Sequence, residues 1–475
     1  KYYDAANEVG KLFILDLAAA GGAAEGLVYA RSALASDNKV LHDKAVKALA
    51  AWSQPQHVYG DLLKVARSDT DTKSRLLALR GYISQGGKER KQATCLDILT
   101  KAQALATRPE EKRLIIAAAN PWQEAAFVPL VRAYVADPAV AAEARLSLLN
   151  KVEHFTKQHN VPAGIIQTLN TIVADPASDL PQVERAMQLL DEVAPFAGDW
   201  QGELTLDGKQ QPVVAQVIDL GNGAYQANLL PEFDKRVAPL AVLTGTTGAK
   251  GIALVATADE TRWEGTVATN GFSGTVSGKR TGTFRLSKVE RLSPELGKAP
   301  PADAVVLFDG TNTEAWQHQN GAPCQWRLMD GAMVVNRKRG NLFSKRVFEG
   351  DHEVHLEFRT PLQPAQRGQR RGNSGVYLQG MYEVQILDSY GLEGRDNECG
   401  GIYKVGPPRV NMCAPPWQWQ SYDIAFTAPT FDGAGKKLTS ARMTVRHNGV
   451  LIHEDQEVRG PTGASSTRDE KNPKG

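Results

Sequence analysis

The period of the hydrophobic residues changes at Gly198, and no other feature limits the fold of this 475-residue chain as strongly. Before Gly198, apolar residues recur every three or four positions, as in Lys44–Trp52 and Ser74–Ile83. That spacing is typical of amphipathic helices. After Gly198, apolar residues alternate in short runs between turn residues, which is typical of antiparallel strands. The sequence therefore predicts a multidomain α plus β protein with its helices first.

The helical part, residues 1–197, carries a weak internal repeat. Ala48–Asp69 and Ile115–Asp137 both lead from a helix, through a Trp with a nearby Pro, into a second amphipathic helix that ends in Asp. Helix pairs of this size resemble HEAT-type repeats, which stack to bury faces that one pair leaves open. We expect an α-helical, HEAT-like array that binds an unidentified protein partner. A plain irregular helical domain is the alternative.

Two β-rich regions follow the helices. Residues 198–291 contain at least six short strands with Gly-Asn and Asp-Gly steps, and predict a small antiparallel barrel or sandwich that acts as a spacer. Residues 292–303 are a Pro-rich linker. Residues 304–475 form a second β-rich domain, which holds the aromatic and ionisable clusters that could carry chemistry.

The composition of the chain excludes several functional classes of protein. Lys and Arg number 55 against 53 Asp and Glu, so the net charge of +2 gives no electrostatic footprint for nucleic acid. No apolar run approaches the roughly 18 residues of a membrane span. Since the chain starts at Lys1 and ends in a polar stretch, we expect a processed piece.

Four cysteines are too few for a disulfide scaffold, and no CxxC pair predicts a zinc site. Cys399 and Cys413 flank a loop rich in Gly and Pro. They are either two thiols or one disulfide, and a disulfide would imply an oxidising compartment. We expect a periplasmic or extracellular location.

The segment 370–388 is the best candidate for a site. Strand alternation puts Glu383 and Gln385 on one face, while Val384 and Ile386 point into the core. If the registers match, two neighbouring strands present one polar row; its members are Asn373, Tyr377, Gln379, Glu383 and Gln385, with Arg371 in phase. Polar groups beside an aromatic ring suit a sugar, which needs partners for its hydroxyls and a flat face for its C–H groups. The alternative is the solvated outer face of a sandwich.

Two further segments add candidates to this row. Tyr403 and Lys404 follow a Gly-rich loop, and either could donate a proton or stabilise an oxyanion. Trp417 and Trp419 begin a later strand. We expect one of the two indoles in the core, and we assign Trp417 to the substrate groove.

The order of these segments resembles the 3-keto-disaccharide hydrolase domain family over residues 303–463. The matching pieces are Val306–Thr311 with Trp316, Trp326 with Asp330 and Gly331, Glu353–Pro361, Gly372–Tyr377, Tyr382–Asp388, Gly400–Tyr403, Trp419–Tyr422 and His447–Gly449. The resemblance implies a concanavalin A-like β-jelly-roll sandwich whose concave sheet binds sugar. The site positions that it carries over are Asn373, Ser374, Glu383, Gln385, Asp388 and Tyr403. Family members typically end with a Gln-Asp-His-Gly stretch, which this chain lacks, so we expect an incomplete sheet.

The resemblance also implies action on glycosides oxidised at C3 of the sugar. A ketone at C3 acidifies the proton at C2, and Glu383 is our first choice for the base that removes it. Asp388 and Lys404 complete the predicted catalytic set. The enolate needs a donor such as Arg371, Asn373 or Lys404, or a divalent metal, and the sequence does not decide between them. A separate sugar oxidoreductase must supply the ketone, and no oxidised nicotinamide is required in this step.

Two other functions remain open for the C-terminal domain. In the first, it is a non-catalytic carbohydrate-binding module carried by a helical scaffold. In the second, it is an ordinary retaining glycosidase with alternating carboxylates on one strand. Gln385 stands where that second pattern needs an acid, and Asp388 is out of phase with Glu383 unless a bulge intervenes.

Overall fold

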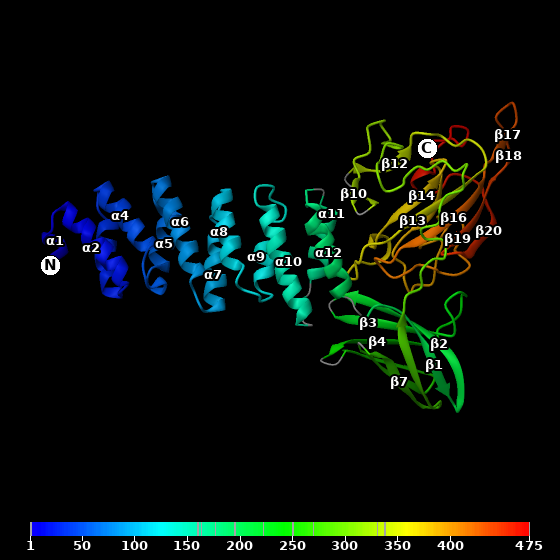
Figure 1. Cartoon of the computed structure of the whole chain (residues 1–475), viewed down its shortest axis with the longest axis horizontal. Helices are drawn as coiled ribbons and strands as arrows, with labels where there is room; N and C mark the ends of the chain where they lie inside the picture. The colour runs from blue at the N-terminus through cyan, green and yellow to red at the C-terminus, as the bar shows by residue number, and fades with distance from the viewer. Residues whose placement is uncertain are drawn as a thin grey trace. The chain divides into compact units, whose positions relative to one another are not determined.

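The computed structural model describes residues 2–158, 161–162, 164–175, 177–193, 196–221, 223–248, 251–268, 270–329, 331–336 and 339–474. Asp330, one of the residues in the family resemblance, lies outside this set. Contacts divide the chain into two compact units, Lys1–Pro162 with Ala177–Leu189 and Ala163–Pro176 with Leu190–Gly475. The predicted order of helices followed by antiparallel sheets is confirmed (Figure 1).

Helices fill the N-terminal part of the chain. They are α1 (Tyr2–Ala5), α2 (Glu8–Gly21), α3 (Leu27–Leu34), α4 (Lys39–Ala50), α5 (Tyr59–Ser68), α6 (Thr72–Gly87), α7 (Gln92–Gln103), α8 (Pro109–Ala119), α9 (Phe127–Arg132), α10 (Ala141–Lys157), α11 (Ile165–Ala174) and α12 (Leu180–Val193). Several begin where the sequence offers a cap. Asn38 accepts hydrogen bonds from the first turn of α4, Asp71 does so for α6, and Pro109 opens α8.

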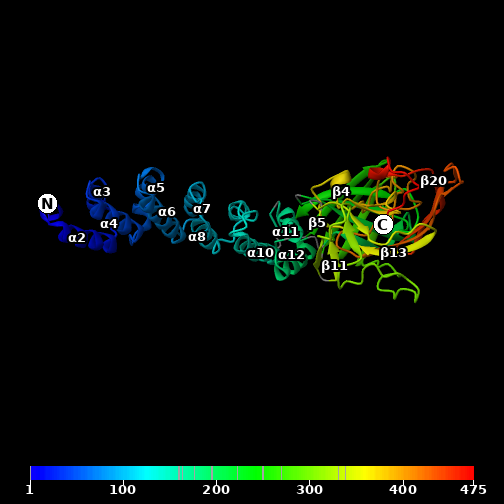
Figure 2. The same ribbon diagram turned by 90° about the horizontal axis from the view of Figure 1, so that it is seen from above.

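The helices α4, α6 and α8 follow one another side by side, as both views show (Figures 1 and 2). Ion pairs repeat along this row and on to the next helix, α10. The Nε atom of Arg80 on α6 lies 2.7 Å from Oε1 of Glu111 on α8, and Nε of Arg113 on α8 lies 2.7 Å from Oε1 of Glu143 on α10. The row therefore repeats one polar contact from helix pair to helix pair.

The two self-similar stretches of the sequence also share a structural device. Gln85 Nε2 donates to the carbonyls of Ala50 and Trp52, 2.9 and 2.8 Å away, at the end of α4. Lys151 Nζ donates to the carbonyl of Ala119, 2.8 Å away, at the end of α8. In both places a buried polar side chain satisfies carbonyls that a helix end leaves unpaired.

Residues 198–289 form a closed antiparallel barrel, which confirms the predicted small β domain and selects the barrel over the sandwich. Its strands are β1 (Gly198–Leu206), β2 (Lys209–Gly221), β3 (Ala224–Leu230), β4 (Ala241–Gly248), β5 (Gly251–Ala258), β6 (Thr261–Ala268), β7 (Gly271–Gly278) and β8 (Gly282–Val289). Strand β1 pairs with both β2 and β8, which closes the barrel. Its inward-facing side chains form a filled core that includes Trp200, Trp263, Phe272 and Phe284.

The remaining strands belong to the C-terminal domain. They are β9 (Trp316–His318), β10 (Arg327–Met329), β11 (Ala332–Val334), β12 (Leu342–Ser344), β13 (His352–Phe358), β14 (Ser374–Leu378), β15 (Tyr382–Ile386), β16 (Gln420–Thr427), β17 (Thr430–Phe431), β18 (Lys437–Thr439), β19 (Ala441–His447) and β20 (Val450–Val458). Four of them form an antiparallel sheet in the order β13-β16-β19-β20, and β14 pairs with β15 as a separate hairpin.

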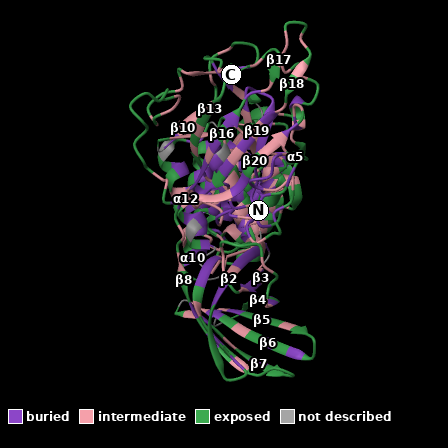
Figure 3. Ribbon diagram, turned by 90° about the vertical axis from the view of Figure 1, so that its right-hand side faces the viewer, coloured by how far each residue is buried: buried purple, intermediate pink, exposed green. Residues whose placement is uncertain are grey.

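The hairpin and the four-stranded sheet share one hydrophobic core. Val384 of the hairpin and Ile424, Met443 and Ile452 of the sheet are all buried in it. Figure 3 shows buried residues, in purple, gathered in the strands of this sheet. Because the inner face of β15 is used for packing, its opposite face is the one available for a site.

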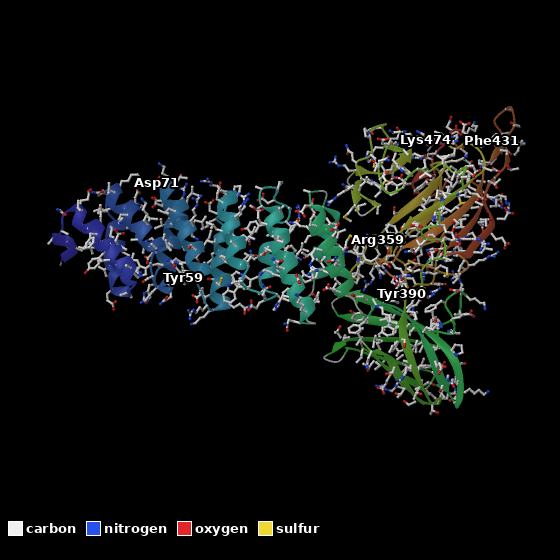
Figure 4. All side chains as sticks on the ribbon, viewed as in Figure 1. Tyr59, Asp71, Arg359, Tyr390, Phe431 and Lys474 are labelled. Atoms are coloured by element: carbon white, nitrogen blue, oxygen red, sulfur yellow. The ribbon has the colours of Figure 1, made fainter. Side chains whose placement is uncertain are left out.

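The barrel and the C-terminal domain pack against each other. Ile218 of the barrel strand β2 belongs to the hydrophobic core of the C-terminal domain. Tyr390, labelled in Figure 4, donates a hydrogen bond to Oδ1 of Asp199 over 2.6 Å, and Asn228 Nδ2 donates to the carbonyl of Gly391 over 2.8 Å. The predicted linker also makes a contact here, because Ser293 Oγ lies 2.7 Å from Ser421 Oγ.

Candidate functional site

The hairpin β14–β15 sets the geometry of the candidate site. In its register Tyr377 lies opposite Glu383, and Gly375 lies opposite Gln385. Side chains directly opposite each other on one face of an antiparallel pair lie within contact distance. The register thus brings the phenol of Tyr377 to the carboxylate of Glu383, and the two side chains are hydrogen-bonded.

These side chains line a cavity of about 990 Å³. Six of the residues predicted from the sequence meet there: Asn373, Tyr377, Glu383, Gln385, Tyr403 and Lys404. Other lining residues come from the end of β20 and from the segment that follows it. We call residues 459–466 the C-terminal strap. The backbone N–H of Thr462 donates to the carbonyl of Met381 over 2.9 Å, and Thr462 Oγ1 accepts from the backbone N–H of Glu383 over 2.8 Å, so the strap is bound along β15.

Glu383 is a buried acid in the lining of this cavity. Its side chain is only 6% exposed. Burial raises the pKa of the carboxyl group, and the hydrogen bond from Tyr377 opposes that rise. The pKa of Tyr377 is raised too, first by burial and then by the hydrogen bond to Glu383. The phenol of Tyr377 can therefore keep its proton while the carboxylate of Glu383 accepts another, as a general base must.

An amide cluster forms one end of the cavity. Gln385 Nε2 donates to Oε1 of Gln369 over 2.9 Å, and Gln369 Nε2 donates to the carbonyl of Asn397 over 2.6 Å. Asn373 Nδ2 lies 3.1 Å from the carbonyl of Gln369. Because the amides orient one another, they present fixed donors and acceptors to a ligand with several hydroxyl groups.

The position of Gln385 is also fixed from behind. Its backbone N–H donates to the carbonyl of Gly401 over 2.9 Å. Its own carbonyl accepts from the hydroxyl of Tyr422 over 2.8 Å and from the backbone N–H of Gly400 over 3.0 Å. The loop from Gly400 to Tyr403 thus lies along the edge of the hairpin and places Tyr403 at the cavity.

Arg371 and Asp388 lie outside the cavity lining and form a buried ion pair. Both Nε and Nη2 of Arg371 donate to Oδ2 of Asp388, over 2.9 and 2.7 Å. Asp388 is fully buried and follows the last residue of β15, Ile386, by two positions, so the alternation of the strand no longer determines its direction. Burial raises the pKa of Asp388, and the charge of Arg371 opposes the rise.

The structure places three other predicted residues away from the cavity. Gln379 stands in the hairpin turn at φ +52°, where its Nε2 donates to the carbonyls of Phe348 and Glu349 over 3.0 and 2.9 Å. Ser374 is half-buried on β14, opposite Ile386. Trp417 has φ +68° and packs beside the guanidinium of Arg359, 5.4 Å from its ring. The expected alternation fails at Gln379 because β14 ends at Leu378.

Lys404 lies at the exposed rim of the cavity. Its backbone has φ +58°, and its ammonium group is 5.7 Å from the ring centroid of Tyr403. A cation over an aromatic face is held there by the ring quadrupole. Lys404 is therefore the cationic side chain best placed, among the predicted residues, to meet negative charge that develops in the cavity.

Several lining residues were not predicted from the sequence. Gln369 lies in the 3-10 turn η4 (Gly368–Arg370), and Gln456, Glu457 and the strap reach the cavity from the end of β20. No pattern within either segment indicated that its side chains would reach the cavity. Only the three-dimensional pairing of β19 with β20 and the strap contacts bring them to β15.

The described cysteines form no disulfide. Cys95, Cys324, Cys399 and Cys413 are free thiols. Of the two alternatives for Cys399 and Cys413, two thiols are therefore confirmed over a disulfide. Across the described ranges of the chain, no group of three or more His, Cys, Asp and Glu side chains is arranged to hold a metal ion. In those same ranges, no helix combines the length and the apolar character that crossing a bilayer requires.

A polar cavity with a buried carboxylate, in a domain of packed antiparallel strands, is typical of carbohydrate-active proteins. A match to a family model supports that class. Residues 303–475 match the family model of the 3-keto-alpha-glucoside-1,2-lyase-like domain, which confirms the resemblance seen in the sequence. A solved structure described as a "putative glycosyl hydrolase" from Parabacteroides distasonis is 38% identical over 34% of this chain and 70% of that chain, with a TM-score of 0.33. No curated protein matches the chain.

Proposed function

We propose that this chain cleaves the glycosidic bond of 3-keto-glycosides, with Glu383 as the base that removes the proton from C2. One observation carries the proposal: a buried carboxylate of raised pKa, paired with a tyrosine, lines a polar cavity inside the segment that matches the family model. A base whose pKa is raised toward the working pH is the more effective proton acceptor.

The proposed reaction begins with proton transfer. A ketone at C3 acidifies the C2–H bond, and Glu383 accepts the proton while the electron pair moves toward the C3 oxygen. The negative charge on that oxygen needs a donor, and Asn373 and Lys404 are the predicted donors that line the cavity. The C1–O bond then breaks, the electron pair leaves with the aglycone oxygen, and that oxygen takes a proton. Addition of water at C1 of the resulting enone would give net hydrolysis.

The polar lining supports a sugar as the ligand. The amides of Gln369, Asn373 and Gln385 offer donors and acceptors for hydroxyl groups, and Tyr403 offers an aromatic ring beside them. Because a 3-keto sugar must be made by oxidation, a separate sugar oxidoreductase would supply the substrate.

Incubation of the full chain with a 3-keto-disaccharide and with its unoxidised parent tests the proposal, each with and without a chelator. We expect cleavage of the oxidised sugar alone. Equal cleavage of both sugars would refute the proposal, and the chelator arm reports whether a divalent metal takes part.

Glu383→Gln is the matched variant. Loss of a general base should lower turnover by roughly 10²–10⁴-fold. Binding of the keto-sugar, followed by calorimetry, should persist because the amide keeps the shape of the side chain. If the wild type binds but never cleaves, the domain is a carbohydrate-binding module. The pH profile gives a second check: since burial raises the pKa of Glu383, activity should fall on acidification at a pH above the ordinary range of a Glu carboxyl.

We propose that the N-terminal helices are HEAT-like repeats, on the basis of the ion pairs and carbonyl caps that recur from helix pair to helix pair. We also propose that the hairpin and the four-stranded sheet are part of a β-jelly-roll sandwich. Their shared hydrophobic core supports this assignment.

A further inference from the structure

Glycine stands at two positions that enclose the Glu383 carboxylate. Gly375 lies on β14, two residues before Tyr377, and Gly463 lies in the C-terminal strap. We refer to the space bounded by Gly375, Gly463 and the Tyr377 hydroxyl as the carboxylate slot.

The environment of Gly375 explains why no side chain stands there. A Cβ atom at this position would overlap Oε1 of Glu383 and would lie 3.1 Å from its Cγ and Cδ atoms. These three atoms of Glu383 are the nearest neighbours that such a Cβ would meet. The backbone of Gly375 is ordinary extended strand, so glycine is not needed there for its conformation. Glycine inside a strand weakens the strand and often marks a close approach of another group.

Gly463 closes the slot from the other side. A Cβ atom there would overlap Oε2 of Glu383 and would lie 3.1 Å from the hydroxyl oxygen of Tyr377. Its backbone has φ +55°, so this glycine is also required by its conformation. The strap is anchored beside it by the hydrogen bonds of Thr462 to β15. Gly375 therefore gives the cleaner test of the two.

We infer that Gly375 and Gly463 are positioning residues: they leave room for the Glu383 carboxylate and hold it in one orientation toward the cavity. This inference rests on the proposed function, in which Glu383 is the base. It also explains the Gly in the Asn-Ser-Gly-Val-Tyr stretch, to which the sequence alone gave no role.

Gly375→Ala in the full chain tests the inference. The three nearest atoms that the added methyl group would meet all belong to the flexible side chain of Glu383, so the variant should fold, and the carboxylate should move toward the cavity. A displacement of this kind in a catalytic group is expected to lower kcat on the order of 10²-fold. KM should change little, because the amide cluster that would hold the sugar is untouched. Gly350→Ala is the control, since a Cβ atom at Gly350 meets nothing within 4 Å and Gly350 lies outside the cavity lining.

A direct readout of Glu383 separates this inference from the proposed function. Burial is the largest cause of the raised pKa of Glu383. A carboxylate displaced into the open cavity should therefore titrate closer to the ordinary range of Glu. We would follow this by carbon NMR of labelled Glu side chains, assigned with the Glu383→Gln variant.

The outcomes are distinct. The inference is supported if Gly375→Ala lowers the pKa of Glu383 while its Tm stays that of wild type and Gly350→Ala has no effect. This holds even if no keto-sugar is cleaved. In that case only the proposed function fails. An unchanged pKa together with unchanged kcat would overturn the slot. Rescue gives a further check: Glu383→Asp shortens the side chain by one methylene group, so adding it to Gly375→Ala should cost less activity than adding it to wild type.

Discussion

Removing Arg371 should expose how strongly the Arg371–Asp388 ion pair supports the C-terminal domain. The guanidinium makes two hydrogen bonds to one carboxylate oxygen, and both side chains are almost completely buried, at 6% and 0% exposure. Arg371→Met keeps the length of the side chain and deletes its charge. The carboxylate of Asp388 is then left buried without a counter-charge, which typically costs about 3–5 kcal/mol.

Thermal unfolding followed by circular dichroism measures this loss. For a unit of this size, each kcal/mol lowers the Tm by about 2–4 °C, so we expect a fall on the order of 10 °C. The control is Arg395→Met, which breaks an exposed ion pair with Glu393 and should leave the Tm nearly unchanged. Replacing both partners, in Arg371→Met with Asp388→Leu, should recover most of the stability because no buried charge remains.

The stability of the Arg371→Met variant should depend on pH, and the pKa of Asp388 determines the direction of that dependence. Burial already raises the pKa of Asp388, and loss of Arg371 raises it further. A carboxyl group whose pKa is higher in the folded than in the unfolded state contributes its full stabilisation of the fold at pH values below the unfolded pKa of about 3.9. This stabilisation is lost as the pH rises through the folded pKa. The stability deficit of the variant should therefore be large at about pH 7 and small at about pH 4. Equal deficits at both pH values, or a wild-type Tm, would refute the reasoning.

Two more substitutions test single hydrogen bonds. Tyr377→Phe removes the hydrogen bond that lowers the pKa of Glu383, so the acid limb of the kcat/KM profile should move to higher pH; a shift to lower pH would contradict the assigned pair. Tyr390→Phe removes the 2.6 Å hydrogen bond to the buried Asp199 and should cost about 1–3 kcal/mol, measured as a lower Tm; no change in Tm would mean that this contact does not join the barrel to the C-terminal domain.

Local periodicity was sufficient to predict the order of elements and the central part of the site. Alternation along a strand depends only on the backbone, so Glu383 and Gln385 could be assigned to one face of their strand, while placing Tyr377 beside them depended on the register that the structure supplies. Short alternating runs and their turns predicted a small antiparallel domain in the same way, but closure into a barrel rather than a sandwich came only from the structure.

Prediction failed where the strands end. Gln379 lies one residue beyond β14, in a turn with positive φ, and Asp388 lies two residues beyond β15, so neither keeps the phase of its strand. Gln369 and the C-terminal strap reach the cavity through contacts between distant parts of the chain. Such contacts leave no periodic signal in the sequence, which is why the second wall of the cavity was not foreseen.

The packing of the barrel on the C-terminal domain has a consequence for where this protein can be divided. The family match begins at residue 303, yet the carbonyls of Gly391 and Gly394 accept hydrogen bonds from Asn228 and Arg236 of the preceding barrel region. The same loop continues to Asn397, whose carbonyl orients an amide of the cavity. A fragment trimmed to the matched segment would expose apolar surface at that junction and loosen one end of the cavity. A piece suited to biochemical work should therefore keep the barrel in front of the C-terminal domain, rather than start at the point where sequence similarity begins.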